Sequence, residues 1–154
     1  MSNQAIVLAH ADPAPARKTL TRHFPTGARI VVGLAFFVFG LDGFLHFIPP
    51  PQPGSVPEGA MALATAFAKS GYLLQLVKGT ELVAGALLLA NRFVPLALVL
   101  LAPVLVNILA YHLFLAPSSI AIGFALTLLA GYLAWIHRAA YRGVLAAGGT
   151  AQPS

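Results

Sequence analysis

Four long apolar runs dominate the sequence and constrain its fold more than any other feature. They cover approximately residues 28–48, 72–90, 94–116 and 119–136. Because a helix rises 1.5 Å per residue, about 20 helical residues cross the hydrocarbon core of a bilayer. Only 8% of the residues are charged, against about a quarter in a soluble domain. The sequence therefore predicts an all-α integral membrane protein, a four-helix bundle of up-down-up-down topology.

The segments outside these runs are polar or rich in proline. Residues 1–25 contain three prolines and predict a disordered tail, which precedes a transmembrane domain at residues 26–142 and a flexible tail at 143–154. Ser55 and Glu58 have the spacing of a capping box, which predicts a short interfacial helix after the first run. Gly71 predicts the end of that helix.

Lysine and arginine are distributed unequally between the two ends of the runs. The opposite loops hold only Lys69, whereas seven basic residues flank the runs at the end that carries both termini: Arg17, Lys18, Arg22, Arg29, Arg92, Arg138 and Arg142. The positive-inside rule therefore predicts that both termini are cytoplasmic, in a bacterial-type inner membrane. Basic residues that flank apolar runs indicate a lipid bilayer as partner and argue against nucleic acid.

Six polar residues within or at the ends of the runs form the candidate site: Asp42, His46, Lys78, Glu81, Asn107 and His112. The helical rise puts all of them within about 14 Å of the non-cytoplasmic end of their runs. Charged side chains at such depths cost several kcal/mol unless they are paired or hydrated. We expect Asp42 to pair with Lys78, which comes from another run at a similar depth.

Most of these residues also have a purely structural interpretation. Lys78 and Glu81 are three residues apart and are able to form an ion pair that holds the bundle together. His46 and His112 lie near enough to the surface to be interfacial residues. Asn107 is suited to hydrogen-bonding a neighbouring helix, or to satisfying the backbone disturbed by a proline one turn earlier.

The sequence offers little support for a metal centre. The Glu-x-x-His spacing of di-iron bundles is absent, the chain has no cysteine, and the two site histidines lie near the same membrane surface. We therefore expect no metal and no cofactor held by the chain itself. No nucleotide-binding loop or catalytic motif occurs, so no catalytic residue is assigned.

With these residues located, the chain resembles the DoxX family of small four-helix membrane proteins. The resemblance spans about Thr26 to Arg142 and is carried by GLDGFLHFIP at 40–49, LVKGTE at 76–81 followed by Gly85, and NRFVP at 91–95 before the run with Asn107 and His112. The family takes its name from a subunit of a thiosulfate:quinone oxidoreductase. The resemblance thus implies a membrane subunit of an oxidoreductase system that binds quinone, or a similar lipophilic ligand, near the polar cluster.

Other functions stay open, because relatives in the wider superfamily include a cargo receptor and an assembly chaperone. A second interpretation is a non-enzymatic accessory or assembly protein for another membrane protein. A third is a small-solute transporter, which with four spans would act as an oligomer. Since the chain lacks cysteine, it does not match the relatives that use thiols, and any electron transfer would need a quinone or the cofactor of a partner redox protein. Whether the chain is an enzyme is left open.

Overall fold

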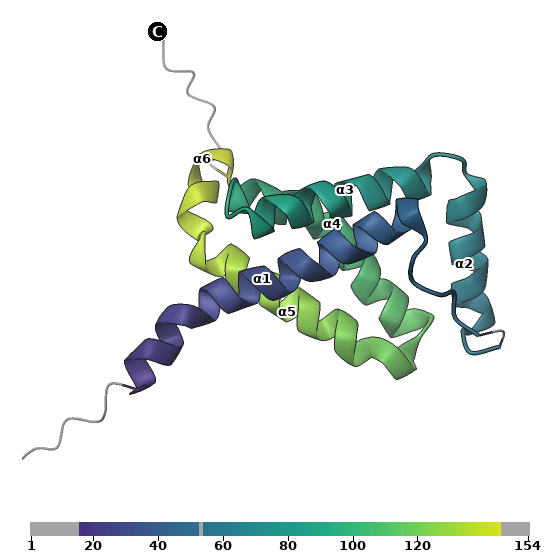
Figure 1. The fold of residues 1–154 in the computed structure, drawn as a ribbon, viewed down its shortest axis with the longest axis horizontal. Helices are drawn as coiled ribbons and strands as arrows, with labels where there is room; N and C mark the ends of the chain where they lie inside the picture. The colour runs from purple at the N-terminus through teal and green to yellow at the C-terminus, as the bar shows by residue number, and fades with distance from the viewer. Residues whose placement is uncertain (1–15, 53, 146–154) are drawn as a thin grey trace, which may run out of the picture.

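The computed structural model describes residues 16–52 and 54–145, and the regular elements in these ranges are all helices. In chain order they are α1 (Ala16–Leu45), α2 (Glu58–Lys69), α3 (Leu73–Leu89), α4 (Val94–Phe114), η1 (Pro117–Ser119), α5 (Ile120–Ile136), η2 (Arg138–Tyr141) and α6 (Arg142–Leu145). The long helices α1, α3, α4 and α5 lie alongside one another, and α2 stands across one end of the group (Figure 1). The expected all-α fold is confirmed.

Three stretches of helix are long and apolar enough to cross a membrane: His23–Leu45, Val94–Phe114 and Pro117–Ile136. Helix α3 has 17 residues and is about 25 Å long, a little less than the hydrocarbon core of a bilayer. It meets α2 at an angle of 93°, and the two helices together qualify as one broken span. The chain therefore has the helices of a multi-pass membrane protein, with three spans, or up to four if this bent pair is one of them.

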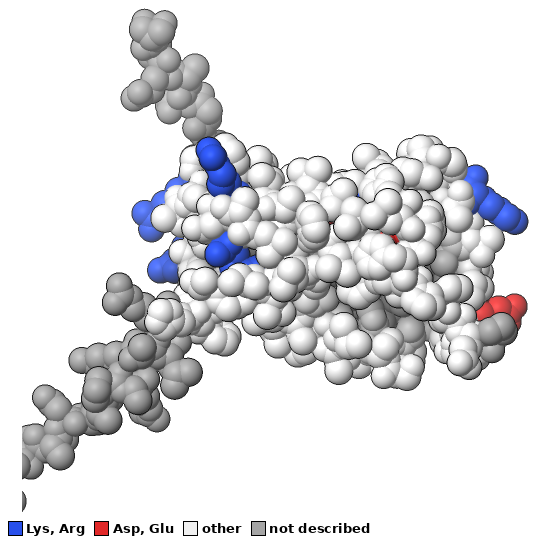
Figure 2. All heavy atoms as spheres, viewed as in Figure 1, with Lys and Arg blue, Asp and Glu red and all other residues white. Residues whose placement is uncertain are grey.

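The charges are arranged as a membrane protein requires. Figure 2 shows the lysine and arginine side chains mostly at one end of the visible face, with a long zone almost free of charge beside them. Many large apolar side chains of the long helices are exposed, among them Leu34, Val99, Val106 and Leu128. Because exposing such a large apolar surface to water is unfavourable, the surface is suited to contact with lipid.

Helix α1 differs from the expected first span at both ends. It begins at Ala16, so residues 16–25, which we expected in a disordered tail, are helical. It ends at Leu45, because His46 adopts a left-handed φ of 51° and three prolines follow at 49–51. At the other end of the chain, α6 occupies the start of the expected tail. The remainder of both tails, 1–15 and 146–154, lies outside the described residues.

Helix α2 is the expected short helix after the first run, and its end is set as predicted. Gly71 has a φ of +79°, a conformation that favours glycine, and it separates α2 from α3. The capping box was wrong. Pro57 occupies the N-cap position, and the hydroxyl of Ser55 donates to the backbone oxygen of Gln52 at 2.7 Å.

Helices α1 and α3 make the most extensive contact between two helices, because glycines let their backbones approach closely. A Cβ atom added at Gly40 would collide with the backbone nitrogen of Leu82 and lie 2.8 Å from its Cα. A Cβ added at Gly85 would likewise collide with the backbone of Phe37. Since the residue numbers of these contacts rise on one helix as they fall on the other, α1 and α3 are antiparallel.

The remaining contacts join α3 to α4, α4 to α5, and α5 to α1. The buried core draws large side chains from each of these helices, among them Val32, Leu88, Leu101 and Leu133. On α3 the buried residues follow the spacing of a single helix face: Glu81, Ala84, Gly85 and Leu88. The carboxylate of Glu81 therefore lies on the face of α3 that packs against the rest of the protein.

Candidate functional site

The centre of the candidate site is an ion pair within α3. The ammonium nitrogen Nζ of Lys78 donates to Oε2 of Glu81 at 2.9 Å, and the two residues lie almost one turn apart. The side chain of Glu81 is only 6% exposed, whereas that of Lys78 is 25% exposed. Because an unpaired carboxylate at such depth would be strongly unfavourable, Lys78 supplies the charge that makes the burial of Glu81 tolerable.

Helix α1 shapes the path that the lysine takes to its partner. The aliphatic stem of Lys78 passes over Gly43, where an added Cβ would lie 2.7 Å from both Cβ and Cδ of the lysine. Any larger residue at position 43 would therefore displace the stem. Asp42 precedes Gly43 in the sequence, but it forms no ion pair with the lysine.

The expected pair between Asp42 and Lys78 is not formed; among the described side chains the only ion pair joins Lys78 to Glu81. Oδ1 of Asp42 instead accepts the backbone N–H of Ile48 at 2.7 Å. The backbone N–H of His46 donates to the carbonyl oxygen of Asp42 at 2.8 Å, as in the left-handed termination motif of helices. The role of Asp42 in this structure is to satisfy a backbone donor where α1 ends.

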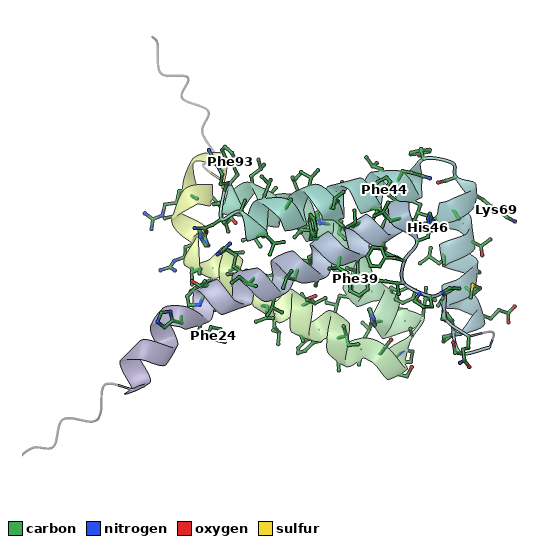
Figure 3. The ribbon with its side chains drawn as sticks, viewed as in Figure 1. Phe24, Phe39, Phe44, His46, Lys69 and Phe93 are labelled. Atoms are coloured by element: carbon green, nitrogen blue, oxygen red, sulfur yellow. The ribbon has the colours of Figure 1, made fainter. Side chains whose placement is uncertain are left out.

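His46 occupies the left-handed position of that motif. It is exposed and lies where α1 turns into the loop that leads to α2 (Figure 3). A φ of 51° is uncommon for residues other than glycine, although histidine adopts it more readily than most. His46 therefore serves the end of α1, and it belongs to no ion pair among the described residues.

His112 lies on another side of the protein, between α4 and α5. Its ring packs against Gly123, where an added Cβ would lie 2.8 Å from Nδ1. Nδ1 also lies 2.8 Å from the carbonyl oxygen of Ile108, which is an acceptor only, so Nδ1 carries the proton of this bond. The ring of the neighbouring Tyr111 stands nearly perpendicular to the imidazole, with ring centres 5.3 Å apart. These contacts do not connect His112 to the Lys78–Glu81 pair.

Asn107 belongs to a groove between α2, α3 and α4. The groove has a volume of about 260 Å³ and is lined mainly by apolar side chains, including Phe67, Leu76 and Val104. Its polar lining residues are Thr80 and Asn107. Within the described part of the chain, the Asn107 side chain forms no hydrogen bond, so neither structural interpretation given to it above is seen. Its amide is available to a ligand.

The six candidate residues therefore do not form one cluster. Lys78 and Glu81 pair on α3, Asp42 and His46 end α1 close to that pair, Asn107 lines a separate groove, and His112 lies at the α4–α5 contact. Within the described ranges, no group of three His, Cys, Asp or Glu side chains is arranged to hold a metal ion.

Sequence reasoning missed two polar residues that the structure makes prominent. The first is Thr80, whose hydroxyl donates to the carbonyl oxygen of Leu76 at 2.8 Å. Because a threonine hydroxyl is commonly satisfied in this way within its own helix, the sequence does not mark Thr80 as a site residue. The second is Arg29, which the sequence marks only as one of the basic residues that flank the first run. Its guanidinium donates to the last carbonyl oxygens of α3, those of Leu88 and Leu89, where a cation also complements the helix dipole.

Comparison with protein-family models, curated proteins and solved structures finds no match to this chain.

Proposed function

We propose that this protein is a DoxX-like membrane subunit of an oxidoreductase system, and that it binds a quinone or a similar lipophilic ligand in the groove between α2, α3 and α4. The observation that carries the proposal is the pair of polar groups, Thr80 and Asn107, in an otherwise apolar groove. Ligand sites typically combine apolar walls with a few polar groups that fix orientation. A quinone ring is apolar on its faces and carries carbonyl oxygens, which accept hydrogen bonds.

The volume of the groove limits what fits within it. At about 260 Å³ it is slightly smaller than the usual site for a drug-sized ligand. It suits a single ring, with the isoprenoid or alkyl tail extending into lipid along the exposed side chain of Leu76. Asn107 offers an amide N–H₂ to one ligand oxygen, since that amide has no partner among the described residues.

The proposed topology and orientation of the protein in the membrane rest on its helices and on the positions of its charges. We propose that the bent pair α2–α3 serves as the second of four spans, which gives an up-down-up-down bundle. Both termini would then be cytoplasmic in a bacterial-type inner membrane, because the arginines lie at the end where α3 finishes and α4 begins. In this orientation the groove and the Lys78–Glu81 pair lie in the non-cytoplasmic half, and partner redox proteins would exchange electrons with the bound quinone.

The test uses purified protein and a decyl-substituted benzoquinone as ligand. Binding should raise the unfolding temperature, because a ligand that binds only the folded state stabilises it. Asn107→Leu should weaken the apparent affinity about twofold to tenfold, the range for one hydrogen bond. The control is Thr127→Val, which also replaces a polar side chain by an apolar one, but on α5 and outside the groove; the hydroxyl of Thr127 is already bonded to the carbonyl oxygen of Gly123 at 2.8 Å. An affinity that is unchanged in Asn107→Leu would contradict the proposed site.

A second candidate function is an accessory or assembly role, and the closed Lys78–Glu81 pair favours it. A carboxylate already bonded to a lysine serves stability without any ligand. This role predicts that wild-type protein shows no quinone-dependent rise in unfolding temperature, while Lys78→Met still lowers the yield of folded protein. Quinone binding by the wild type would exclude it as the sole function.

A further inference from the structure

A second and larger groove lies at the end of the protein where the arginines gather. It has a volume of about 670 Å³, within the range of ligand sites. Its walls are almost entirely apolar. They come from the first half of α4, the last turn of α5 and the short helix η2, and include Leu96, Val99, Ala102, Ala134 and Tyr141.

Tyr141 joins the two sides of this groove. Its hydroxyl donates to the carbonyl oxygen of Pro95 at 3.3 Å and so ties η2 to the start of α4. Burial raises the pKa of the Tyr141 hydroxyl above its ordinary value, so the group stays neutral and keeps donating. Since Leu96 and Val99 are more than half exposed, the groove is open to whatever surrounds the helices, which in a membrane is lipid.

Two arginines adjoin the lining residues Ala140 and Tyr141 in the sequence. Arg138 belongs to η2, as do two of the lining residues, and Arg142 begins α6. The guanidinium of Arg138 lies 5.0 Å from the centre of the Trp135 ring and donates to the backbone oxygen of Trp135 at 3.1 Å. The sequence from 94 to 145, which forms the groove and its rim, contains no aspartate or glutamate. Arg138 and Arg142, which we take as the rim of the groove, are therefore the only charged residues of this segment, and both are basic.

We propose that this groove is a binding site for an anionic phospholipid, with an acyl chain along α4 and α5 and the phosphate group at Arg138 and Arg142. The apolar walls suit the acyl chain of such a lipid, and the basic rim suits its negatively charged phosphate group. The planar guanidinium of Arg138 has five N–H donors, most of which remain available to phosphate oxygens. Trp135, 67% exposed beside it, has the amphipathic character of residues that lie at the membrane interface.

A zwitterionic lipid would fill the groove equally well but would gain less from the rim. A basic residue near an anionic surface contributes about 1 kcal/mol, which corresponds to roughly a fivefold preference for each arginine. The proposal is independent of quinone binding, because the groove between α2, α3 and α4 shares none of its lining residues with this one.

The experiment uses Trp135, the only tryptophan of the chain, as the reporter. Protein is reconstituted in vesicles of phosphatidylcholine with increasing fractions of brominated phosphatidylglycerol, or of brominated phosphatidylcholine in a parallel series. Bromine quenches tryptophan only at close approach, so the two curves give the relative affinity for the two headgroups at this position. We expect at least a fivefold preference for phosphatidylglycerol. Equal quenching by the two lipids in the wild type would overturn the proposal.

Variants separate the rim from the general charge of the protein. Arg138→Gln with Arg142→Gln should bring the preference to within about twofold of equality. Lys69→Gln is the control, because it removes one charge from an exposed residue that ends α2 and does not line the groove. It should leave the preference unchanged. An equal loss in the two proteins would contradict a local site.

Ala102→Phe tests the groove itself. It fills the groove without changing any charge, and should reduce quenching by brominated acyl chains of both lipids. Quenching that is unaffected by this variant would show that the acyl chain lies elsewhere. Far-ultraviolet circular dichroism of each variant confirms that its helices are intact. The wild-type comparison tests the proposal even if a variant does not fold.

Discussion

Replacing Lys78 with methionine removes the cation that neutralises the most deeply buried charge of the described chain. Methionine keeps most of the volume and flexibility of the lysine stem, so the contact with Gly43 is largely preserved. The change therefore acts chiefly on Glu81, whose side chain is 6% exposed and has Lys78 as its ion-pair partner.

The magnitude follows from the unequal burial of the two partners. Breaking a buried ion pair by removing one partner typically costs about 3–5 kcal/mol, because the other charge is left uncompensated. For Lys78→Met we expect about 3 kcal/mol, the lower end of that range, since the pair is partly open to its surroundings. Glu81→Gln should cost less, about 1–2 kcal/mol, because the lysine left behind is 25% exposed and its long stem can carry the ammonium group towards water.

The assay is unfolding in mixed micelles by titration with dodecyl sulfate, followed by circular dichroism of the helices. The double variant Lys78→Met with Glu81→Leu provides the control, because replacing a whole buried pair by apolar residues is often neutral or stabilising. We expect it to lie within about 1 kcal/mol of the wild type. If Glu81→Gln is more destabilising than Lys78→Met, or if the double variant is the least stable of the three, then the reasoning from burial is wrong.

Three further predictions concern the helix contacts and ends. Gly40→Ala should destabilise the protein by about 1–3 kcal/mol in the same assay, because its Cβ would meet the backbone of Leu82 rather than a movable side chain; Gly131→Ala, which meets nothing within 4 Å, is the control and should be nearly neutral. Asp42→Ala should cost about 1 kcal/mol, while Asp42→Asn, which keeps an oxygen for the N–H of Ile48, should cost less than half as much; equal losses would mean that the charge, not the hydrogen bond, matters. In an alkaline absorbance titration, subtracting Tyr141→Phe from the wild type should reveal a tyrosine with a pKa above 10.0. The stability that this raised pKa contributes is present below about pH 10 and is lost as the pH rises through the folded-state value; a component at or below 10.0 would contradict the burial of this hydroxyl.

Much of the fold follows from local features of the sequence. The break at Gly71 was predictable because it needs only a residue that tolerates a positive φ. The end of α3 just before Asn91-Arg92 was also predictable, because the second apolar run stops at residue 90. There the N–H groups of these two residues bond back to the carbonyls of Leu88 and Leu87, with Asn91 at a φ of 54°. The capping box failed because its residues had a local alternative, a turn in which Ser55 bonds to Gln52.

The candidate site was less predictable than the helices that carry it. Helical rise gives the depth of a residue to within a few ångström, and on that basis the sequence predicts that Asp42 pairs with Lys78. Depth does not fix the direction in which a side chain leaves its helix. That direction depends on how α1 and α3 are rotated against each other, which the glycine contacts at positions 40, 43 and 85 determine. Lys78 consequently reaches Glu81, and Asp42 bonds to the backbone of Ile48.

The sequence by itself determined that this chain belongs in a membrane and is built of helices, because run length and the scarcity of charge are properties of the chain alone. It also determined which end of the helices is basic. Only the tertiary structure decided which charges are paired. It also decided where the two grooves discussed above lie, one with Thr80 and Asn107 between α2, α3 and α4, and one lined by residues of α4, α5 and η2. The physical reason is that a groove or an ion pair needs side chains from a particular face of a helix, or from several helices, and packing, rather than composition, selects those faces.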